Sequence, residues 1–375
     1  GQLGDGRALL LGQVINADKQ RFDIQLKGAG ETPYSRMGDG RAVLRSCIRE
    51  YLCGEAMHGL GIATTRALCI VGTNESVQRE TVEPGAILTR VAESHIRFGH
   101  FEHFNHTVKD KSLVKILADH VIAEHFTGAS YEAWFLEVIH RTAVMIANWQ
   151  AVGFCHGVMN TDNMSILGLT LDYGPFGFME TYDPAYVCNH SDHQGRYAYN
   201  MQPSVAYWNL NALAFALESL IDIEDAKALL KEYQPKLMAT YKQLMAEKLG
   251  LANSTDEDVS LWQQLLTLMR DYNADYTNTF RALSYIDTLE NKQACDAFLS
   301  VFKLLDNTSH NAVLAWLNTY LKRVASGFGY RIDPLYKDSR LHAGLDFSAP
   351  TGTPIYATAD GEVQIAGFNT DGYGN

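Results

Sequence analysis

The sequence predicts an α+β fold in which strands and helices occupy separate stretches of the chain. Residues 1–107 are rich in Gly, Thr, Val and Arg, and turns separate their short apolar runs, a pattern typical of strands. Residues 111–152 and 210–324 carry apolar side chains three and four positions apart, a pattern typical of helices. Residues 327–375 return to Gly, Pro and Thr with strand-like alternation. We therefore expect three parts, the last of them a short all-β fragment that begins after a boundary near 324–329.

The first part is predicted to hold strands and turns around one helix. A strand-like run over 22–26 leads into Lys27, which precedes a glycine-rich turn. The helix is predicted to begin near Gly40 and to continue through Leu52. Its N-terminus would offer free N–H groups and a positive dipole end to a phosphate. One face carries three arginines, which either contact phosphate or form an ordinary solvated face. They are Arg41, Arg45 and Arg49.

The second part is predicted to be helical at both ends. Residues 111–152 carry two helical patterns, and the second, over 132–151, repeats apolar side chains at helical spacing. A loop-rich stretch over 153–209 follows and holds most of the unusual residues. From 210 to 324 the pattern is almost wholly helical.

Composition excludes several classes of protein. Of the 375 residues, 46% are hydrophobic and 20% charged, which is typical of a globular protein. The 31 Lys and Arg against 43 Asp and Glu give a net charge of -12, whereas a general nucleic-acid binder needs a basic surface. No apolar run approaches the roughly 18 residues of a membrane-spanning helix. We expect neither a nucleic acid nor a membrane as partner.

The six cysteines lack the spacing of a disulfide framework or a zinc ribbon. We expect reduced, mostly buried thiols and a cytoplasmic location. Because the chain opens at Gly1 without a Met, a targeting signal removed from its start stays an open alternative.

Glycine-rich turns and arginines in the first part are candidates for phosphate binding. Gly4 and Gly6 precede Arg7, and Asp39 and Gly40 precede the predicted helix. Glycine lets the backbone approach phosphate oxygens, and arginine can hold them. A plain tight turn would account for the first segment as well.

Lys27 gains interest from Glu50, which follows on the predicted helix. A strand Lys paired with a helix Glu is the arrangement by which kinase folds hold a Lys against nucleotide phosphates. Arg90 and Arg97 lie among apolar residues, so we expect at least one to be buried against an anion, either a ligand or an internal carboxylate.

The most informative segment runs from His156 to Asn163 and is followed by Asp172-Tyr173-Gly174. Kinases carry H-R-D-x-x-x-x-N and then D-F-G, so Asn163 and Asp172 match the two metal ligands. Their oxygens suit Mg²⁺. The position of the kinase base is Val158, which cannot accept a proton. Asp162 is the one carboxylate in that loop, and it acts either as the base or in support of the metal. The order Lys27, Glu50, Asn163 and Asp172 therefore predicts a kinase-like site for a nucleotide and Mg²⁺.

Six segments resemble the selenoprotein O family, also called the YdiU protein adenylyltransferases. They are Gly1–Arg7, Gln25–Arg36, Gly38–Arg45, His156–Asn163, Asp172–Gly177 and Asn189–Asp192. The resemblance covers about residues 1–324. It implies a protein-kinase-like, two-lobed fold, with one lobe over 1–107 and a helical lobe over 108–324, that binds ATP in a flipped orientation. It also implies transfer of AMP, with Mg²⁺ or Mn²⁺, to Ser, Thr or Tyr hydroxyls of proteins. The family also has a segment before Gly1, so the first lobe is expected to be N-terminally truncated.

The same resemblance implies a role for each matching residue. Asp162 would be the proton acceptor, Asn163 and Asp172 would hold the metal, and Glu50 would orient Lys27. The nucleotide contacts would be Gly4, Gly6, Arg7, Lys27, Asp39, Gly40, Arg90, Arg97 and Asp172.

Residues 327–375 are similar to a different family. Segments 329–334, 340–347, 352–357 and 360–363 resemble LytM- or lysostaphin-like zinc metallopeptidases, and the resemblance implies His342 and Asp346 as two zinc ligands. A catalytic zinc needs three protein ligands and a water, and the chain stops before the later His-x-His of that family. We expect no firmly held zinc and no peptidase activity, and a chimeric junction is the simplest account of the fusion.

Two other functions stay open at this point. The chain could be an inactive pseudoenzyme that binds only nucleotide, or nothing. It could also be a secreted zinc peptidase in which the first 324 residues are incidental.

Overall fold

The computed structural model describes residues 6–35, 37–251, 255–286, 288–324, 329–332 and 339–342. The chain divides into two compact units, Gly1–Arg323 and Val324–Asn375. The first unit combines a five-stranded antiparallel sheet and a small two-stranded one with a larger set of helices, which confirms the α+β prediction. The division of this unit into two lobes at residue 107 stays a prediction.

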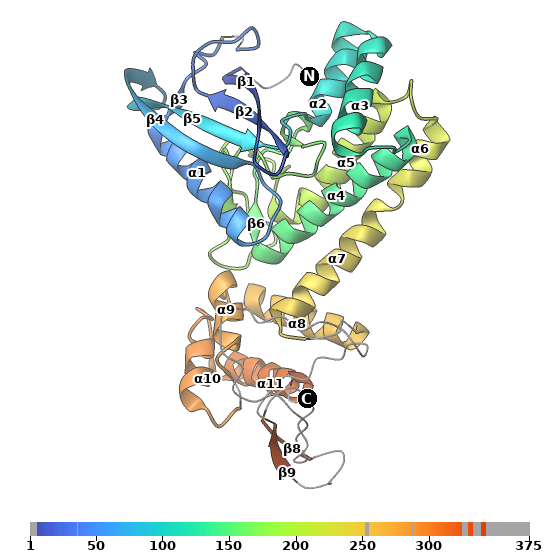
Figure 1. The fold of residues 1–375 in the computed structure, drawn as a ribbon. Helices are drawn as coiled ribbons and strands as arrows, with labels where there is room; N and C mark the ends of the chain where they lie inside the picture. The colour runs from blue at the N-terminus through green and yellow to red at the C-terminus, as the bar shows by residue number, and fades with distance from the viewer. Residues whose placement is uncertain are drawn as a thin grey trace. The chain divides into compact units, whose positions relative to one another are not determined.

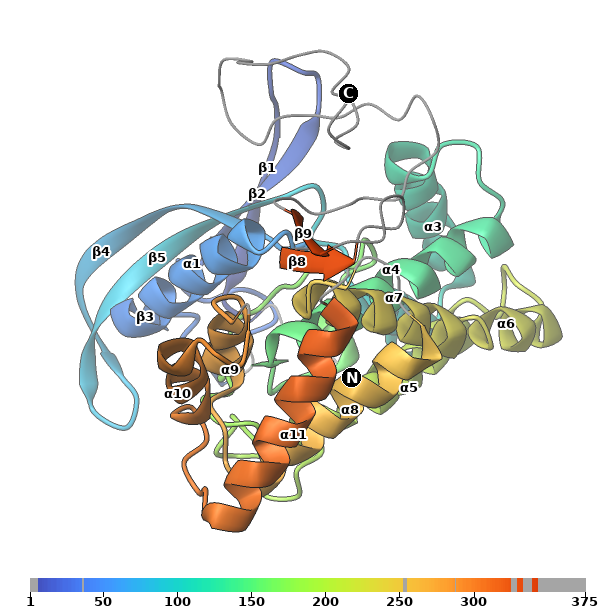
Figure 2. The same cartoon turned by 90° about the horizontal axis from the view of Figure 1, so that it is seen from below.

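The larger sheet of the first unit has five strands and is covered by one helix (Figures 1 and 2). Its order is β1-β2-β5-β3, with β4 also paired to β5, and all the pairs are antiparallel. Helix α1 packs against β4 and β5 through a small apolar cluster that includes Cys47, Ala86 and Leu88. The strands are β1 (Ala8–Ile15), β2 (Arg21–Lys27), β3 (Ala42–Val43), β4 (Arg66–Gln78) and β5 (Val82–Ala92), and the helix is α1 (Leu44–Gly59).

The predicted start of α1 was wrong by four residues. Ala42 and Val43 are buried and pair with Ala86 and Gly85 as strand β3, so the helix begins only at Leu44. The apolar pair is more stable in the sheet because both side chains bury there. Consequently, the segment around Gly40 precedes a strand, and the phosphate-binding helix terminus expected there does not exist.

A run of helices follows the sheet. Helix α2 (Phe98–Glu102) and a π-helical turn (His103–Val108) end the first 108 residues, so this region holds more than the one helix expected. Helix α3 (Lys111–His125) is capped by the Asp110 side chain. Helix α4 (Tyr131–Val152) starts at the capping residue Ser130 and ends at Gly153, whose φ is +70°. The two helices predicted over 111–152 are confirmed.

The stretch after α4 is loop-rich, as expected, but it ends earlier than predicted. It contains strand β6 (Phe154–Cys155), a 3₁₀ turn (Thr161–Asn163), strand β7 (Gly177–Phe178) and a second 3₁₀ turn (Tyr199–Met201). Helix α5 (Gln202–Ala216) then begins eight residues before the predicted 210. A Pro in its first turn suits a helix start because the missing N–H would have had no helical partner there.

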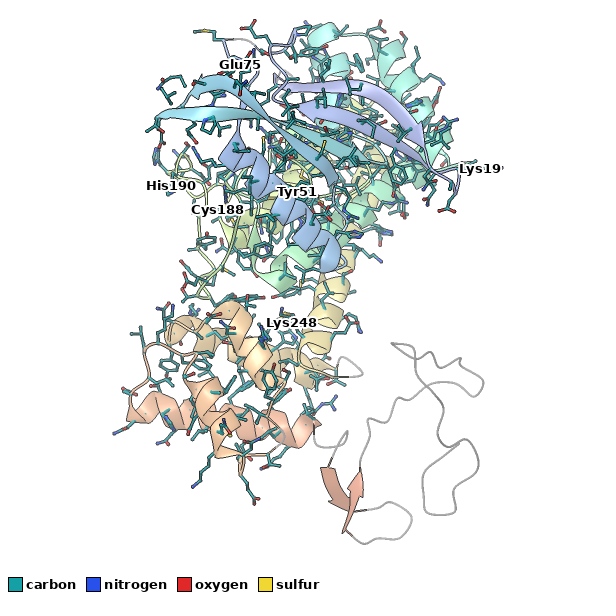
Figure 3. The ribbon with its side chains drawn as sticks, turned by 60° about the vertical axis from the view of Figure 1, so that its left-hand side comes forward. Lys19, Tyr51, Glu75, Cys188, His190 and Lys248 are labelled. Atoms are coloured by element: carbon teal, nitrogen blue, oxygen red, sulfur yellow. The ribbon has the colours of Figure 1, made fainter. Side chains whose placement is uncertain are left out.

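The remaining helices confirm the prediction for 210–324. Helix α7 packs along α4 and leads to the last group of helices (Figure 1). Figure 3 shows Lys248 at the end of α7 and Tyr51 on α1. The elements are α6 (Ile223–Leu230), α7 (Tyr233–Lys248), α8 (Asp256–Asp271), α9 (Tyr276–Leu283), α10 (Lys292–Leu299) and α11 (Asn307–Val324).

In the second unit, the structure describes one antiparallel pair, β8 (Gly329–Ile332) and β9 (Ser339–His342). His342, predicted as a zinc ligand, ends β9, and Asp346 lies outside the described residues. No helix in the described part of the chain combines the length and apolar composition needed to cross a bilayer.

None of the six cysteines, all of which lie among the described residues, forms a disulfide bond. Cys47, Cys53, Cys155 and Cys295 are buried, Cys188 is half-buried and Cys69 is exposed. Cys188 and His190 lie on the loop-rich segment (Figure 3).

Candidate functional site

Strand β2 turns its polar side chains inward. Asp23, Gln25 and Lys27 alternate along the strand, and each is less than 8% exposed, while Phe22, Ile24 and Leu26 on the opposite face are only half-buried. Successive side chains of a strand point to opposite faces, so the three polar groups share one face. Burying polar groups is unfavourable unless they are paired. Asp23 accepts hydrogen bonds from Gln13 on β1 and from the backbone N–H of His95, whereas the partners of Gln25 and Lys27 lie on β5 and α1.

Lys27 and Arg90 share one carboxylate. Lys27 Nζ forms an ion pair with one oxygen of Glu50, and Arg90 Nε lies 2.6 Å from the other. Arg90 Nη1 also donates to Gln25 Oε1 at 3.2 Å, because the strand register places these two residues opposite each other. Glu50 lies on the buried face of α1 with Cys47, Cys53 and Met57. The predicted Lys27–Glu50 ion pair is present.

Asp172 extends this cluster to the loop-rich segment. Its two carboxylate oxygens lie 2.7 Å from Arg90 Nη2 and 2.6 Å from Arg97 Nη1. Both arginines are almost completely buried, at 2% and 1% exposed, so the expected burial is confirmed and their protein partners are internal carboxylates. Asp172 itself has φ +58°, a left-handed conformation that is strained for a residue with a side chain. In this conformation the carboxylate contacts both guanidinium groups.

The cluster has one positive charge in excess, since three cationic side chains surround two carboxylates. Burial alone would raise the pKa of Asp172, but the charges of Arg97, Arg90 and Lys27 outweigh it and hold that pKa well below its ordinary value. Burial likewise raises the pKa of Glu50, and Arg90 and Lys27 reverse the shift. Burial lowers the pKa of Lys27 against the attraction of Glu50. An anionic ligand would balance the excess charge.

Arg97 joins the cluster to the loop that carries Asp162. The same Nη1 that contacts Asp172 donates to the backbone oxygen of Asp162 at 2.8 Å. The carboxylate of Asp162 packs against the backbone of Gly99 on α2, with Cγ 3.2 Å from where a Cβ of residue 99 would lie. A side chain at Gly99 would therefore overlap Asp162. The structure thus brings Lys27, Arg90, Asp172 and Asp162 into one connected site.

Asn163 has an orientation that suits a metal ligand. Its Nδ2 donates to the backbone oxygen of Val158 at 2.9 Å, which leaves Oδ1 for another partner. Asn163 and Asp172 supply hard oxygen atoms, the donors that Mg²⁺ prefers. Among the described residues, no group of three or more His, Cys, Asp and Glu side chains is placed to hold a metal ion. A magnesium site that substrate phosphates complete needs only one or two protein ligands, so the residues fit such a site.

His156 connects the two loops of the site. Its Nδ1 accepts from the backbone N–H of Val158 at 3.4 Å, and its Nε2 donates to the backbone oxygen of Leu171 at 2.8 Å. The ring stacks on Trp149 of α4 with centroids 5.2 Å apart. Burial lowers the pKa of His156, which favours the neutral ring that both contacts require. His156 therefore fixes the segment before Asp172 relative to the loop before Asp162.

The predicted glycine-rich segments lie next to the sheet. Gly6 packs against the backbone of residues 34–35, and the backbone oxygen of Arg7 accepts from Gly28 N–H at 2.7 Å. Gly40 has φ +65° and lies so close to Gly30 that a Cβ there would overlap its carbonyl. Gly4 lies outside the described residues.

Asp39 is held by Arg79 rather than by the buried cluster. The two side chains form a paired contact at 2.7 and 2.9 Å, and hydrogen bonding to Arg79 lowers the pKa of Asp39 to about 2. Asp39 is exposed, and Arg7 is exposed as well. Neither side chain makes a described contact with Asp172.

The three arginines predicted on one helix face have separate protein partners. Arg41 precedes the helix and pairs with Glu75 of β4, which Figure 3 labels. Arg45 contacts Glu83, and Arg49 donates to the backbone oxygens of Gly174 and Phe176. Arg49 thereby connects α1 to the segment that follows Asp172.

Sequence reasoning missed four residues at this site. Gln25 could have been found from the alternation of polar residues on β2 with Asp23 and Lys27. Gly99 gave no signal, because only the folded chain brings it to Asp162. Gln202 and Asn209 of α5 bind the backbone of residues 154–159, which leads to Asp162. Their helix is apolar on most sides, so the sequence does not show which face meets this segment.

Comparison with known proteins gives consistent matches. The family model described as protein adenylyltransferase SelO matches residues 1–333. A protein nucleotidyltransferase YdiU from Vibrio cholerae is 51% identical over 346 residues, which cover 91% of this chain and 69% of that protein. Proteins of the same name from Vibrio vulnificus and Pectobacterium carotovorum are each 53% identical over 86% of this chain and cover 65% and 66% of their own length. The chain thus spans about two thirds of the length of these relatives.

Proposed function

The chain belongs to the protein adenylyltransferase SelO family, and from this premise we propose that it transfers AMP from ATP to Ser, Thr or Tyr hydroxyls of proteins. The observation that carries the proposal is the buried Lys27–Glu50–Arg90–Asp172 cluster with its excess positive charge. It joins Asp162 through Arg97. A nucleoside triphosphate is the kind of anion that such a group of cations would bind.

In this proposal the fold is kinase-like and two-lobed, and ATP lies in the flipped orientation. Lys27, Arg90 and Arg97 contact its phosphates, and Glu50 keeps Lys27 charged and oriented. The glycine-rich turns place backbone N–H groups near the nucleotide. The residues of these turns are Gly4, Gly6, Arg7, Asp39 and Gly40.

Asn163 and Asp172 would hold Mg²⁺. A divalent cation bound there supplies charge stabilisation for the triphosphate and its leaving group. The arginines at Asp172 support the same function, because their charges hold the pKa of that carboxyl well below its ordinary value and so favour the ionised form.

The transfer balances with Asp162 as proton acceptor. The substrate hydroxyl oxygen forms a bond to the α-phosphorus, the bond from that phosphorus to the bridging oxygen breaks, and pyrophosphate leaves. The hydroxyl proton passes to the Asp162 carboxylate. Arg90 and Arg97 stabilise negative charge that develops on the phosphates. Val158 lies where kinases have their base, which disfavours ordinary phosphoryl transfer.

The test is transfer of label from α-labelled ATP to a protein that carries accessible hydroxyls. The wild-type chain should label this protein substrate. Asp162→Asn should reduce the rate of labelling by roughly 10²–10⁴-fold, the usual contribution of a positioned base. Asp18→Asn, the same change in the exposed β1–β2 turn, should leave the rate unchanged. If the protein is labelled by γ-labelled ATP and not by α-labelled ATP, the chain is a kinase and the proposal is overturned.

Two other outcomes identify the alternatives. If ATP and Mg²⁺ raise the melting temperature by mass action but no label is transferred, the chain is a nucleotide-binding pseudoenzyme. Stoichiometric zinc retained after dialysis would instead support a metallopeptidase role for residues 327–375, whose resemblance to LytM-like enzymes stays a prediction. Cysteines that form no disulfide bond, most of them buried, support the proposed cytoplasmic location.

A further inference from the structure

Two buried amide side chains lie on one face of helix α5. Gln202 and Asn209 are both fully buried, at 0% exposed, although their neighbours on the helix are mostly apolar. They are seven residues apart, which is close to two helical turns and places them on the same face. Buried amides are unfavourable unless they are hydrogen-bonded, so their partners show what this face is for.

Both amides bind the backbone of the loop that leads to Asp162. Gln202 Oε1 accepts from the N–H of His156 at 2.9 Å, and its Nε2 donates to the oxygen of Phe154 at 2.9 Å. Asn209 Nδ2 donates to the oxygen of Met159 at 2.8 Å. One helix face thus holds the loop backbone at three points over six residues.

The loop depends on these contacts for its position. Residues 156–160 form no helix or strand, so the buried backbone groups there need side-chain partners. Other side chains also bind this segment: Asn189 Nδ2 donates to Gly157 O at 3.0 Å, and Arg97 Nη1 donates to Asp162 O at 2.8 Å. Between these two points, Asn163 Nδ2 donates to Val158 O within the segment itself. The contact at Met159 is the α5 contact nearest to Asp162, so its loss would loosen the backbone between Val158 and Asp162.

We propose that Gln202 and Asn209 are positioning residues that hold the loop over 154–163 in register, so that Asp162 and Asn163 reach the reacting groups. The proposal rests on the adenylyl transfer proposed above. It assigns α5, whose described side chains form no hydrogen bond or ion pair with Lys27 or Arg90, a role in the rate of transfer and not in the affinity for nucleotide.

The test compares Asn209→Leu with Asn211→Leu. Asn211 lies on the same helix and is half-exposed, and its Nδ2 donates to Tyr207 O at 2.8 Å within α5. We expect Asn209→Leu to lower kcat by roughly 10–100-fold, as misplacement of a reacting group does. The KM for ATP should stay within about twofold, because the phosphate-binding cations are intact. The control variant should keep both values.

Hydrogen exchange separates failure of this proposal from failure of the proposed function. Whether or not the chain transfers AMP, Asn209→Leu should speed exchange of amides in 154–163 by roughly tenfold, the effect of one lost buried hydrogen bond. Exchange elsewhere should not change. If Asn209→Leu does not fold, Asn209→Asp, which has the same shape but cannot donate to Met159 O when ionised, replaces it.

Three results would overturn the proposal. Unchanged exchange over 154–163 would show that the loop is held by other contacts. A kcat equal to that of Asn211→Leu would show that its position does not limit transfer. A parallel loss of ATP affinity would show that α5 acts on the nucleotide site.

Discussion

Glu50→Gln is the perturbation whose consequence follows most directly from the buried cluster. The substitution keeps the size of the side chain and removes its charge. Glu50 is 3% exposed and is the ion-pair partner of both Lys27 and Arg90. Arg90 keeps Asp172 as a counter-ion in the variant. Lys27, which is 5% exposed, would be a buried cation without its carboxylate.

The expected loss is large because the remaining charge cannot reach solvent. Removing one partner of a buried ion pair destabilises a protein by about 3–5 kcal/mol. For a unit of this size, each kcal/mol lowers the melting temperature by about 2 °C, so we expect a decrease of roughly 6–10 °C.

The loss should depend on pH in a known direction. Burial already lowers the pKa of Lys27 in the wild type, against the attraction of Glu50, and the variant lacks that attraction. A base whose folded pKa lies below its unfolded pKa gains stability as pH rises between the two values, because the unfolded chain binds more protons there. The difference between variant and wild type should therefore shrink between pH 7 and about pH 10, near the ordinary pKa of lysine.

The assay is urea unfolding at pH 7 and at higher pH, with Glu55→Gln as the control. Glu55 lies on the same helix and pairs with Arg66, but both side chains are at least one third exposed. Such a surface pair contributes at most about 1 kcal/mol. If Glu50→Gln costs no more than Glu55→Gln, or if its loss grows with pH, the inference of a buried, charge-balanced cluster is refuted.

Two further changes test the same site. Gly99→Ala should lower the kcat of transfer at least about tenfold, because a methyl group would overlap the Asp162 carboxylate. Steady-state kinetics measure this change, and an unchanged kcat would contradict the packing of Asp162 against Gly99. Asp172→Asn should lower stability at pH 7 by about 3 kcal/mol. This loss should narrow as pH falls below about 4, because a carboxylate with a depressed folded pKa loses its contribution there. Urea midpoints at pH 7 and pH 3 measure the difference, and a gap that does not narrow would contradict the ion pairing.

The order of the site residues along the chain was predictable, and so was the Lys27–Glu50 pair. Both follow from local signals: a strand that ends at a Lys, a helix with one acidic residue on its apolar face, and the loop from His156 to Asn163. The start of α1 was not predictable from its own residues, because Ala42 and Val43 suit a helix as well as a strand. Pairing with β5 decides their conformation.

Contacts between distant segments account for what the sequence could not predict. Arg97 contacts both Asp172 and the backbone of Asp162, and Gly99 adjoins the Asp162 carboxylate. No spacing or composition in the sequence indicates either of these contacts. The amides of Gln202 and Asn209 are similar, because the position of their helix relative to the loop exists only in the folded chain.

The mass of a hydroxyl-bearing protein after incubation with this chain, ATP and Mg²⁺ tests the account most directly. Intact-protein mass spectrometry should find an increase equal to one adenylyl group, which is absent when Asp162→Asn replaces the wild type. An increase equal to one phosphoryl group would contradict the account, because it would mean that the γ-phosphorus and not the α-phosphorus is attacked.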